Sequence, residues 1–269
     1  ARSVEQTRAL GNTTEEATAA GFAGVALAAL GDFERALPYA DHGLRLAEGL
    51  GNPFVQAAAY NYRAAAYGHQ GASTEAIADC EAGRRVAEWA GDRFRIYLLQ
   101  FYEGHAYLMV DEPARARELI DSSIALAKQL GTTTLLAWGQ GLLATALLRL
   151  DEIRPVLTLC EEAIRLAEDT RDRLANALAH RTLAEALVRL TPPAADRAER
   201  ALLDAIRIYH ELGCRPELAR SYVTYARLLK GWQRLDEAKG YIAEAVGMFR
   251  GMGMARDLAR AEHEAAGLA

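Results

Sequence analysis

The chain has 269 residues and 51% of them are hydrophobic, which is enough to bury a large core and argues against a disordered chain. The net charge of −5 provides no basic surface for nucleic acid or for an anionic membrane. Three scattered cysteines are too few for a disulfide framework, and no run of 18 apolar residues predicts a transmembrane helix, so we expect a cytoplasmic protein.

A turn signal recurs every forty residues along the chain. From Gly31 it reaches Gly71, Asp111, Asp151, Thr191 and Gly231, and a second signal falls about midway at Gly51, Gly91, Gly131, Arg171, Gly213 and Gly253. A fixed period of this length is typical of a protein built from stacked structural repeats.

The segments between these turns have the periodicity of helices. Stretches such as "IADCEAGRRVAEWA" and "LIDSSIALAKQL" place apolar residues at i, i+3, i+4 and i+7, and no convincing run alternates with period two. Thr13 and Glu16 have the spacing of a capping box, and a glycine past a helix can end it in the left-handed conformation. Each period therefore predicts two antiparallel helices, which we name the A helix and the B helix.

In chain order, the pattern divides the sequence into three parts. Residues 1–11 are expected to end the second helix of a preceding repeat, because Gly11 lies one period before Gly51. Residues 12–253 are expected to form six repeats, and residues 254–269 a helix that caps the last of them. The chain begins with Ala1 rather than methionine, so we expect it to be a piece of a longer protein.

Three columns of small residues emerge when the six periods are aligned. The A helices carry Gly24, Ala64, Gly104, Ala144, Ala184 and Thr224; the B helices carry Ala36, Ala76, Ala116, Val156, Ala198 and Ala238, and then Gly43, Gly83, Ser123, Ala163, Ala205 and Ala245. Small side chains let helix axes approach closely. A single pair has too little core to be stable alone, so the pairs must stack on one another.

The spacing of these columns resembles the tetratricopeptide repeat, although the period is forty residues instead of 34. The subtype with "LAxxLG" endings is similar to the C-terminal sensor arrays of bacterial ATP-dependent regulators, including maltose-regulator-like activators and ATPase-linked nucleotide cyclases, and to the peptide-binding arrays of cell-polarity scaffolds. The resemblance implies an all-α, right-handed solenoid of about six antiparallel helix pairs with a C-terminal capping helix.

The sequence offers no catalytic, metal or cofactor motif. It lacks a "GK" dipeptide, so it has no phosphate-binding P-loop, and no cysteine or histidine pair has the spacing of metal ligands. Cys80 and Cys160 share a column of core residues, whereas Cys214 follows a turn glycine and is expected to be more exposed. We therefore predict a protein that is not an enzyme and needs no cofactor.

At two aligned positions of the A helices the type of residue changes from repeat to repeat. We interpret these positions as free of the packing between helices. The resemblance implies that they line a concave groove that binds a ligand. The candidate groove residues are Asn61, Tyr62, His69, Phe101, Tyr102, His105, Arg181, Glu185, Tyr222 and Tyr225. For Tyr62, Tyr102 and Tyr222 packing between repeats is an equal alternative. Trp89 stands where other repeats have Gln129, Asp169 and Glu211, so it is expected to be exposed.

The function predicted from these features is recognition. We expect a signalling module of a larger bacterial regulator that binds a protein or peptide segment, or a small effector, and contacts other domains of its parent protein, without binding nucleic acid or membranes. The alternative is a scaffold that self-associates through its outer faces or ends. The sequence leaves the ligand, the flanking domains and the oligomeric state open.

Overall fold

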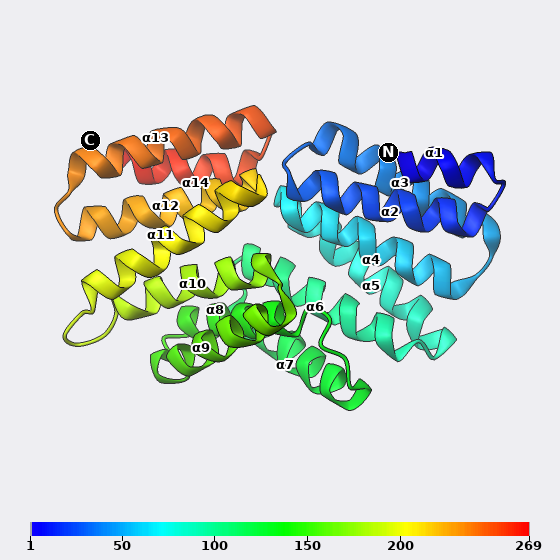
Figure 1. Cartoon of the computed structure of the whole chain (residues 1–269), viewed down its shortest axis with the longest axis horizontal. Coiled ribbons are helices and arrows are strands. Elements are labelled where there is room, and N and C mark those ends of the chain that lie inside the picture. The colour runs from blue at the N-terminus through cyan, green and yellow to red at the C-terminus, as the bar shows by residue number, and fades with distance from the viewer. Residues whose placement is uncertain (1, 269) are drawn as a thin grey trace. The chain divides into compact units, whose positions relative to one another are not determined.

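The computed structural model describes residues 2–268, and within that range it contains fourteen α-helices and no strand, which confirms the all-α prediction. The helices are shown in Figure 1. Their bounds are α1 Arg2–Ala9, α2 Thr13–Ala29, α3 Phe33–Leu50, α4 Pro53–Gln70, α5 Ser73–Ala90, α6 Arg93–Met109, α7 Pro113–Leu130, α8 Leu136–Arg149, α9 Ile153–Thr170, α10 Arg173–Leu187, α11 Ala195–Leu212, α12 Arg215–Gly231, α13 Leu235–Met252 and α14 Ala255–Ala266.

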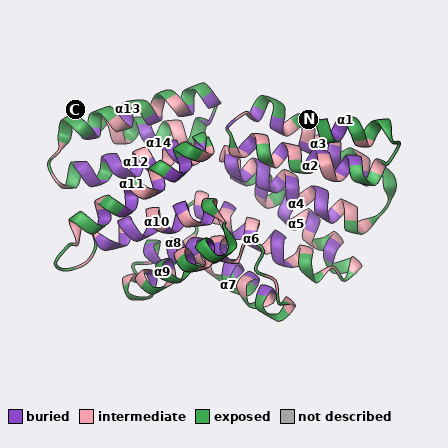
Figure 2. Ribbon diagram, in the orientation of Figure 1, coloured by how far each residue is buried: buried purple, intermediate pink, exposed green. Residues whose placement is uncertain are grey.

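The helices form two compact units, one ending at Gly131 and the other beginning at Thr132. In unit 1, the pairs α2/α3, α4/α5 and α6/α7 pack as antiparallel hairpins, and the A helices α2, α4 and α6 lie side by side. In unit 2, the pairs are α8/α9, α10/α11 and α12/α13, and α14 packs mainly on α13. Helices inside each unit are more buried than the helices at the two ends of the chain. Figure 2 shows more buried residues on α4 and α12 than on α1 and α14.

Local signals set the helix ends, with one difference from the expected capping box. Helix α2 begins at Thr13, but its cap is Asn12, whose side chain accepts a hydrogen bond from the Glu15 backbone N–H at 3.1 Å. Asparagine suits this position because its side-chain oxygen reaches the unpaired N–H groups of the first turn. Asp92 and Asp172 cap α6 and α10 in the same way.

The turns that follow the B helices require a left-handed residue. Gly51 has φ 64° and Gly91 has φ 69°, a region in which a side chain costs energy. Arg171 occupies the equivalent turn with φ 57°, so the repeat imposes the same backbone conformation even where glycine is missing. The regular spacing of these turn residues in the sequence therefore reflects the left-handed backbone conformation that each turn requires.

Small residues bring the paired helices into close contact, as the columns predicted. The first B-helix column is at most 1% exposed in all six repeats, and Gly43 leaves no room for a side chain, since a methyl group there would lie 2.7 Å from the Ala17 carbonyl oxygen. Gly24 and Gly104 are similarly crowded by the B helices α3 and α7. Close packing of this kind is typical of protein interiors.

Helix α8 begins later than the period predicts. Helices α4, α6, α10 and α12 each start two residues after the left-handed turn residue, whereas α8 starts at Leu136, five residues after Gly131. Three consecutive threonines occupy the missing turn, and Leu135 adopts a left-handed φ of 56°. Threonine is stiff at its branched β-carbon and disfavours helix, which explains the shortened start.

Within the last helix, α14, only Ala261 is buried, and the buried residues Met254 and Leu268 flank the helix at its two ends. A mostly exposed helix suits the end of a stack, and the assignment of residues 254–269 to a capping helix stays a prediction. The expectation that residues 1–11 end an earlier repeat stays a prediction, and Ala1 lies outside the described residues. None of the fourteen helices has the length and hydrophobicity that a membrane crossing requires.

The three cysteines are all buried, so the expected exposure of Cys214 is wrong. Cys214 directly precedes α12, and only 4% of it is exposed. Burial raises the pKa of the Cys214 thiol to about 11 and that of Cys160 to about 12, and it raises the pKa of Cys80 well above its ordinary value.

These thiols should react slowly in the folded protein, with Cys214 first. The thiolate is the reactive form, and a raised pKa keeps it scarce at pH 8; its fraction grows as pH approaches the pKa. A time course with a chromogenic thiol reagent, followed by mass spectrometry of the peptides, would give the order. In denaturant all three thiols should react at once. Rapid modification of Cys80 in the native protein would contradict its buried position.

Candidate functional site

The structure buries half of the predicted groove residues. Asn61, Tyr62, His69, Phe101 and Tyr225 are all less than 9% exposed, whereas Tyr102, His105, Arg181, Glu185 and Tyr222 are half-buried. Packing therefore uses the two A-helix columns that the sequence analysis took to be free. The reason is the small residues: the A helices approach so closely that the side chain of one repeat fills the space beside the next.

Tyr62 illustrates this effect. Its ring lies over Gly21 of the preceding A helix, and a methyl group at Gly21 would stand 2.2 Å from the Tyr62 Cδ2 atom. The alternative that Tyr62 packs between repeats is thus the correct one. His105 lies over Gly68 in a looser version of the same contact, with its Nδ1 atom 3.4 Å from the position of a methyl group.

Unit 1 nevertheless carries aromatic side chains on the three neighbouring A helices α2, α4 and α6. We call this part of unit 1 the aromatic face and define it by Phe22, Tyr62, Arg95, Tyr102 and His105. The ring centroids of Phe22 and Tyr62 are 4.6 Å apart, and Phe22 is 59% exposed. Tyr102 packs its edge against Phe101 at 4.9 Å and keeps part of its surface in water.

Arg95 is the cationic group of this face. Its guanidinium carbon lies 5.6 Å from the ring centroid of Tyr62 and 5.7 Å from that of Phe94, within the range of a cation–π contact. One of its nitrogens donates to the Asn61 Oδ1 atom at 3.5 Å. Within residues 2–268 no carboxylate lies within ion-pair distance of Arg95.

Asn61 adds a second donor beside Arg95. Its amide nitrogen Nδ2 is buried and has no hydrogen-bond partner in the described part of the chain. A buried donor without a partner costs free energy, and such groups often mark functional sites. Arg95 offers N–H groups to an acceptor, next to rings that can hold apolar groups, and the buried Asn61 amide lies beside it.

Phe22 and Arg95 are the two members of this face that the sequence analysis missed. Phe22 lies one period before Tyr62, and the column that contains Phe22, Tyr62 and Tyr102 is aromatic in three successive repeats, so the signal was present in the alignment. For Arg95 the alignment gives no comparable signal, because the equivalent residue one period earlier is Val55. Only the structure shows that it reaches back to the previous repeat.

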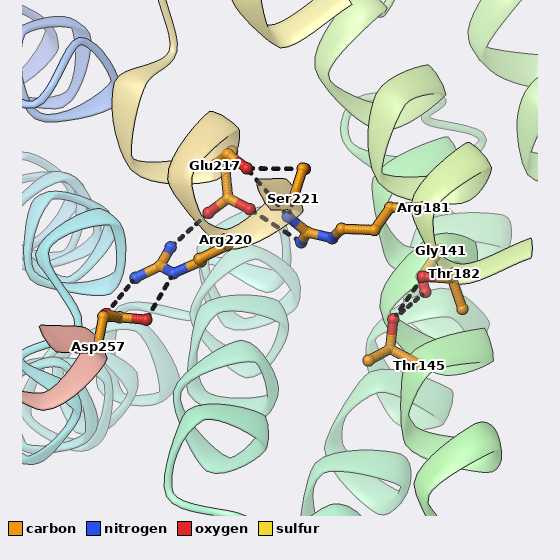
Figure 3. A network of polar contacts seen from close by, with 8 residues as sticks. All are labelled: Gly141, Thr145, Arg181, Thr182, Glu217, Arg220, Ser221 and Asp257. Atoms are coloured by element: carbon orange, nitrogen blue, oxygen red, sulfur yellow. Dashed lines mark hydrogen bonds and ion pairs between the residues drawn. The ribbon is translucent and has the colours of Figure 1, made fainter. Parts of the chain in front are cut away.

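Unit 2 holds a polar network around Arg181, drawn in Figure 3. Arg181 of α10 pairs with the Glu217 carboxylate of α12 at 2.9 Å and hydrogen-bonds to the Ser221 hydroxyl at 3.4 Å. Glu217 also pairs with Arg220 of the same helix. Arg220 in turn binds both carboxylate oxygens of Asp257 in α14 at 3.1 Å. The network thus ties α10, α12 and α14 together.

Arg181 is consequently engaged within unit 2, so packing does not leave it free, and its part in ligand binding stays a prediction. Only 13% of its side chain is exposed, and its guanidinium lies over the Tyr209 ring at 5.6 Å. Burial alone would lower the pKa of Arg181, but Tyr209, Glu217 and Glu185 outweigh it and raise the pKa. The guanidinium therefore stays charged and is neutralised within unit 2.

The remaining candidates in unit 2 are also engaged. Tyr225 donates from its hydroxyl to the Glu199 carboxylate at 2.6 Å, and the ring of Tyr241 packs 4.7 Å from Tyr225 and 5.3 Å from Tyr222. Burial, followed by the nearby Glu199, raises the pKa of Tyr225. These tyrosines hold α12 against the B helices α11 and α13, and Glu185 stays half-buried beside Arg181.

Two further features bear on the chemistry. No group of three or more His, Cys, Asp and Glu side chains between residues 2 and 268 could hold a metal ion. A shallow hollow lies between α13 and α14, lined mainly by apolar residues that include Ile242, Val246 and Leu268, and it contains none of the predicted site residues.

Comparisons with known proteins establish the fold. No family model matches the chain, and no curated protein matches it. Among solved structures, the apo form of RapI is similar with a TM-score of 0.69 and 10% identity, over 88% of this chain and 83% of that one. A Rap protein complexed with competence and sporulation factor gives 0.67 and 14%, over 96% of this chain and 74% of the other.

A signal-transduction ATPase from Pyrococcus horikoshii with a tetratricopeptide repeat sensor gives a TM-score of 0.54 and 17% identity, over 87% of this chain and 36% of that one. At such identities the likeness concerns the fold. The chain therefore has a tetratricopeptide-like helical repeat fold, and its assignment to a forty-residue subtype stays a prediction.

Proposed function

We propose that the chain is a non-enzymatic binding module of a larger bacterial, cytoplasmic regulator and that the aromatic face of unit 1 holds a protein or peptide segment. The observation that carries this proposal is Arg95, a guanidinium placed between two rings with no carboxylate of the described chain to neutralise it. In unit 2 the comparable Arg181 is paired with a carboxylate. The two units therefore differ in whether this guanidinium group is available to a ligand.

The chemistry of the aromatic face fits recognition of a peptide. Aromatic and arginine side chains dominate the binding energy of protein interfaces because they combine large contact areas with directed hydrogen bonds. Phe22 and Tyr102 offer ring surface to apolar side chains, and Arg95 offers N–H groups to carbonyl or carboxylate oxygens.

The dimensions favour an extended segment over a small effector. Adjacent helix axes lie about 8–10 Å apart, so the three A helices of unit 1 span about 20 Å, the length of about six extended residues. A small effector usually binds in a concavity that surrounds most of its surface. A face made by three parallel helices instead suits a chain that crosses them.

Two of the similar structures support the proposal through their descriptions. One is a Rap protein in complex with competence and sporulation factor, and another is named for its tetratricopeptide repeat sensor. The proposal extends such a sensing role to this chain, with its own residues as the contact surface.

Peptide binding at the aromatic face can be tested without a known partner. Peptides selected from a random phage-displayed library against the immobilised chain would be synthesised with a fluorescent label, and their affinity measured by fluorescence anisotropy. We expect Arg95→Ala to weaken binding about 30-fold, equivalent to about 2 kcal/mol for a central contact. Phe22→Ala should weaken it as well, because the ring is exposed and free to pack on the peptide.

Arg85→Ala is the matched control, because Arg85 is an exposed arginine of the same unit on the B helix α5. It should leave the affinity unchanged. If the Arg85 variant lost binding while the Arg95 and Phe22 variants kept it, the ligand would sit on the outer surface and the proposal would be wrong.

A further inference from the structure

Asn61 lies beside the cationic group of the aromatic face and adds no charge to it. It is buried in α4, and its Oδ1 atom accepts the hydrogen bond from Arg95 of α6 at 3.5 Å. The rings of Tyr62 and Phe94 also contact the guanidinium, but a cation–π contact leaves the net charge in place. The positive charge of Arg95 is therefore held in position without being neutralised.

Arg95 is an exception among the half-buried arginines of this chain. The others within residues 2–268 are Arg63, Arg84, Arg117, Arg181, Arg220 and Arg234. Each of them has a carboxylate oxygen within 3.7 Å. A charge that loses part of its water is costly without an opposite charge nearby, and in these six cases the fold supplies one. Arg95 has an amide and two rings in place of the carboxylate.

Unit 2 shows how a carboxylate satisfies such a guanidinium between two A helices. Glu217 of α12 pairs with Arg181 of α10 at 2.9 Å, and the Ser221 hydroxyl adds a hydrogen bond at 3.4 Å. Asn61 occupies the position of Arg181 three periods earlier in the sequence. The same position of the repeat thus carries a guanidinium with its own carboxylate in unit 2, and a neutral amide beside an unneutralised guanidinium in unit 1.

We infer that Asn61 sets the charge preference of the aromatic face, and that the bound peptide carries an acidic side chain, Asp or Glu, which pairs with Arg95. The inference rests on the proposed function and adds the chemistry of the ligand. A neutral residue at position 61 leaves Arg95 for the peptide. A carboxylate there would pair with Arg95 inside the chain, as Glu103 pairs with Arg84 at the same distance of 3.5 Å.

The surroundings of Arg95 indicate what accompanies the acidic residue. The Phe22 ring is 59% exposed and Tyr102 is half-buried, so both offer contacts to apolar side chains. Arg95 is the only arginine among the residues that define the aromatic face, and they include no lysine. A peptide with one acidic residue among apolar ones matches this composition better than a run of acidic residues, which would bring several charges to a single cation.

Asn61→Asp tests the inference, because aspartate has the shape of asparagine and differs in charge. The probes are peptides selected by the intact chain from a random phage-displayed library and synthesised with a fluorescent label and an amidated C-terminus, so that Asp and Glu side chains are their only carboxylates. Each peptide is also made with its acidic residue replaced by the matching amide. By fluorescence anisotropy, the unmodified chain should bind the acidic form about 10-fold more tightly.

In the Asn61→Asp variant the acidic and amide forms should bind about equally, because the new carboxylate takes the place of the peptide's own. Arg95→Gln, which removes the cation instead, should equalise them as well. Asn176→Asp is the matched control, since Asn176 is a half-buried asparagine of α10 in unit 2, and it should keep the preference for the acidic form. Circular dichroism melts would show that each variant folds.

Three results would overturn the inference: selected peptides without an acidic residue, equal binding of both forms by the unmodified chain, or a preference that survives Asn61→Asp. A preference that Asn176→Asp abolished equally would overturn it too, because the effect would then be independent of Arg95. The proposed function would stand in each case as long as Phe22→Ala weakens peptide binding and Arg85→Ala does not.

Discussion

Replacing Glu217 with glutamine should lower the free energy of unfolding by about 3 kcal/mol. The Glu217 carboxylate lies between the guanidinium groups of Arg181 and Arg220, and each of the three side chains is only 13% or 14% exposed. Removing one member of a buried ion pair costs about 3–5 kcal/mol because the partner charge is left without compensation. We expect the lower end because Arg220 keeps Asp257, whereas Arg181 loses its paired carboxylate.

The chain provides a matched control for this change. Glu211 also bridges two arginines, Arg173 and Arg207, but its side chain is 43% exposed and the two arginines are about half-exposed. Water screens such pairs, so Glu211→Gln should cost less than about 1 kcal/mol. Urea unfolding followed by circular dichroism would compare the two variants. Equal losses would show that burial of the Arg181 network adds nothing to stability.

Alanine should have opposite effects at two glycines of the B helices. At Gly43 in α3 the added methyl group would lie 2.7 Å from the Ala17 carbonyl oxygen of α2, which is a backbone atom that cannot rotate away. The two helices must separate, at a cost of about 1–3 kcal/mol that is typical of overpacking. At Gly247 in α13 nothing lies within 4 Å of the new methyl group.

Gly247→Ala should therefore stabilise the protein by about 0.5–1 kcal/mol, because alanine loses less backbone entropy than glycine on forming a helix. Thermal or urea unfolding of both variants would test the pair. A stabilising Gly43→Ala would mean that α2 and α3 are further apart than the structure shows, since helix propensity alone would then govern both sites.

The fold could be predicted from the sequence because the signals that define it are local or occur in all six repeats. These signals are the period of the turns, the helix caps and the columns of small residues. Gly43 and Ala163 are recognisable as packing positions since the same column is small in every copy. The late start of α8 occurs in one repeat only and is produced by three threonines and a left-handed Leu135. The division into two units at Gly131 was not predicted either.

The site was harder to predict because the deciding contacts link residues about forty positions apart. Arg181 and Arg95 both read as charged groups on an A helix. Only the structure shows that Arg181 meets Glu217 of the next repeat, whereas Arg95 meets the amide of Asn61 and the ring of Tyr62. Variation within a column was taken as freedom from packing, but Gly21 of such a column is small because the Tyr62 ring of the next A helix packs over it.

The most direct measurement is to locate a bound peptide on the surface. A peptide selected by the intact chain would carry a photoreactive benzophenone at its centre, and mass spectrometry would identify the crosslinked residues after irradiation. Binding at the aromatic face predicts crosslinks to α2, α4 and α6, which disappear with Arg95→Ala. Crosslinks confined to the helices of unit 2, or to the turns that carry Trp89 and Phe54, would contradict it.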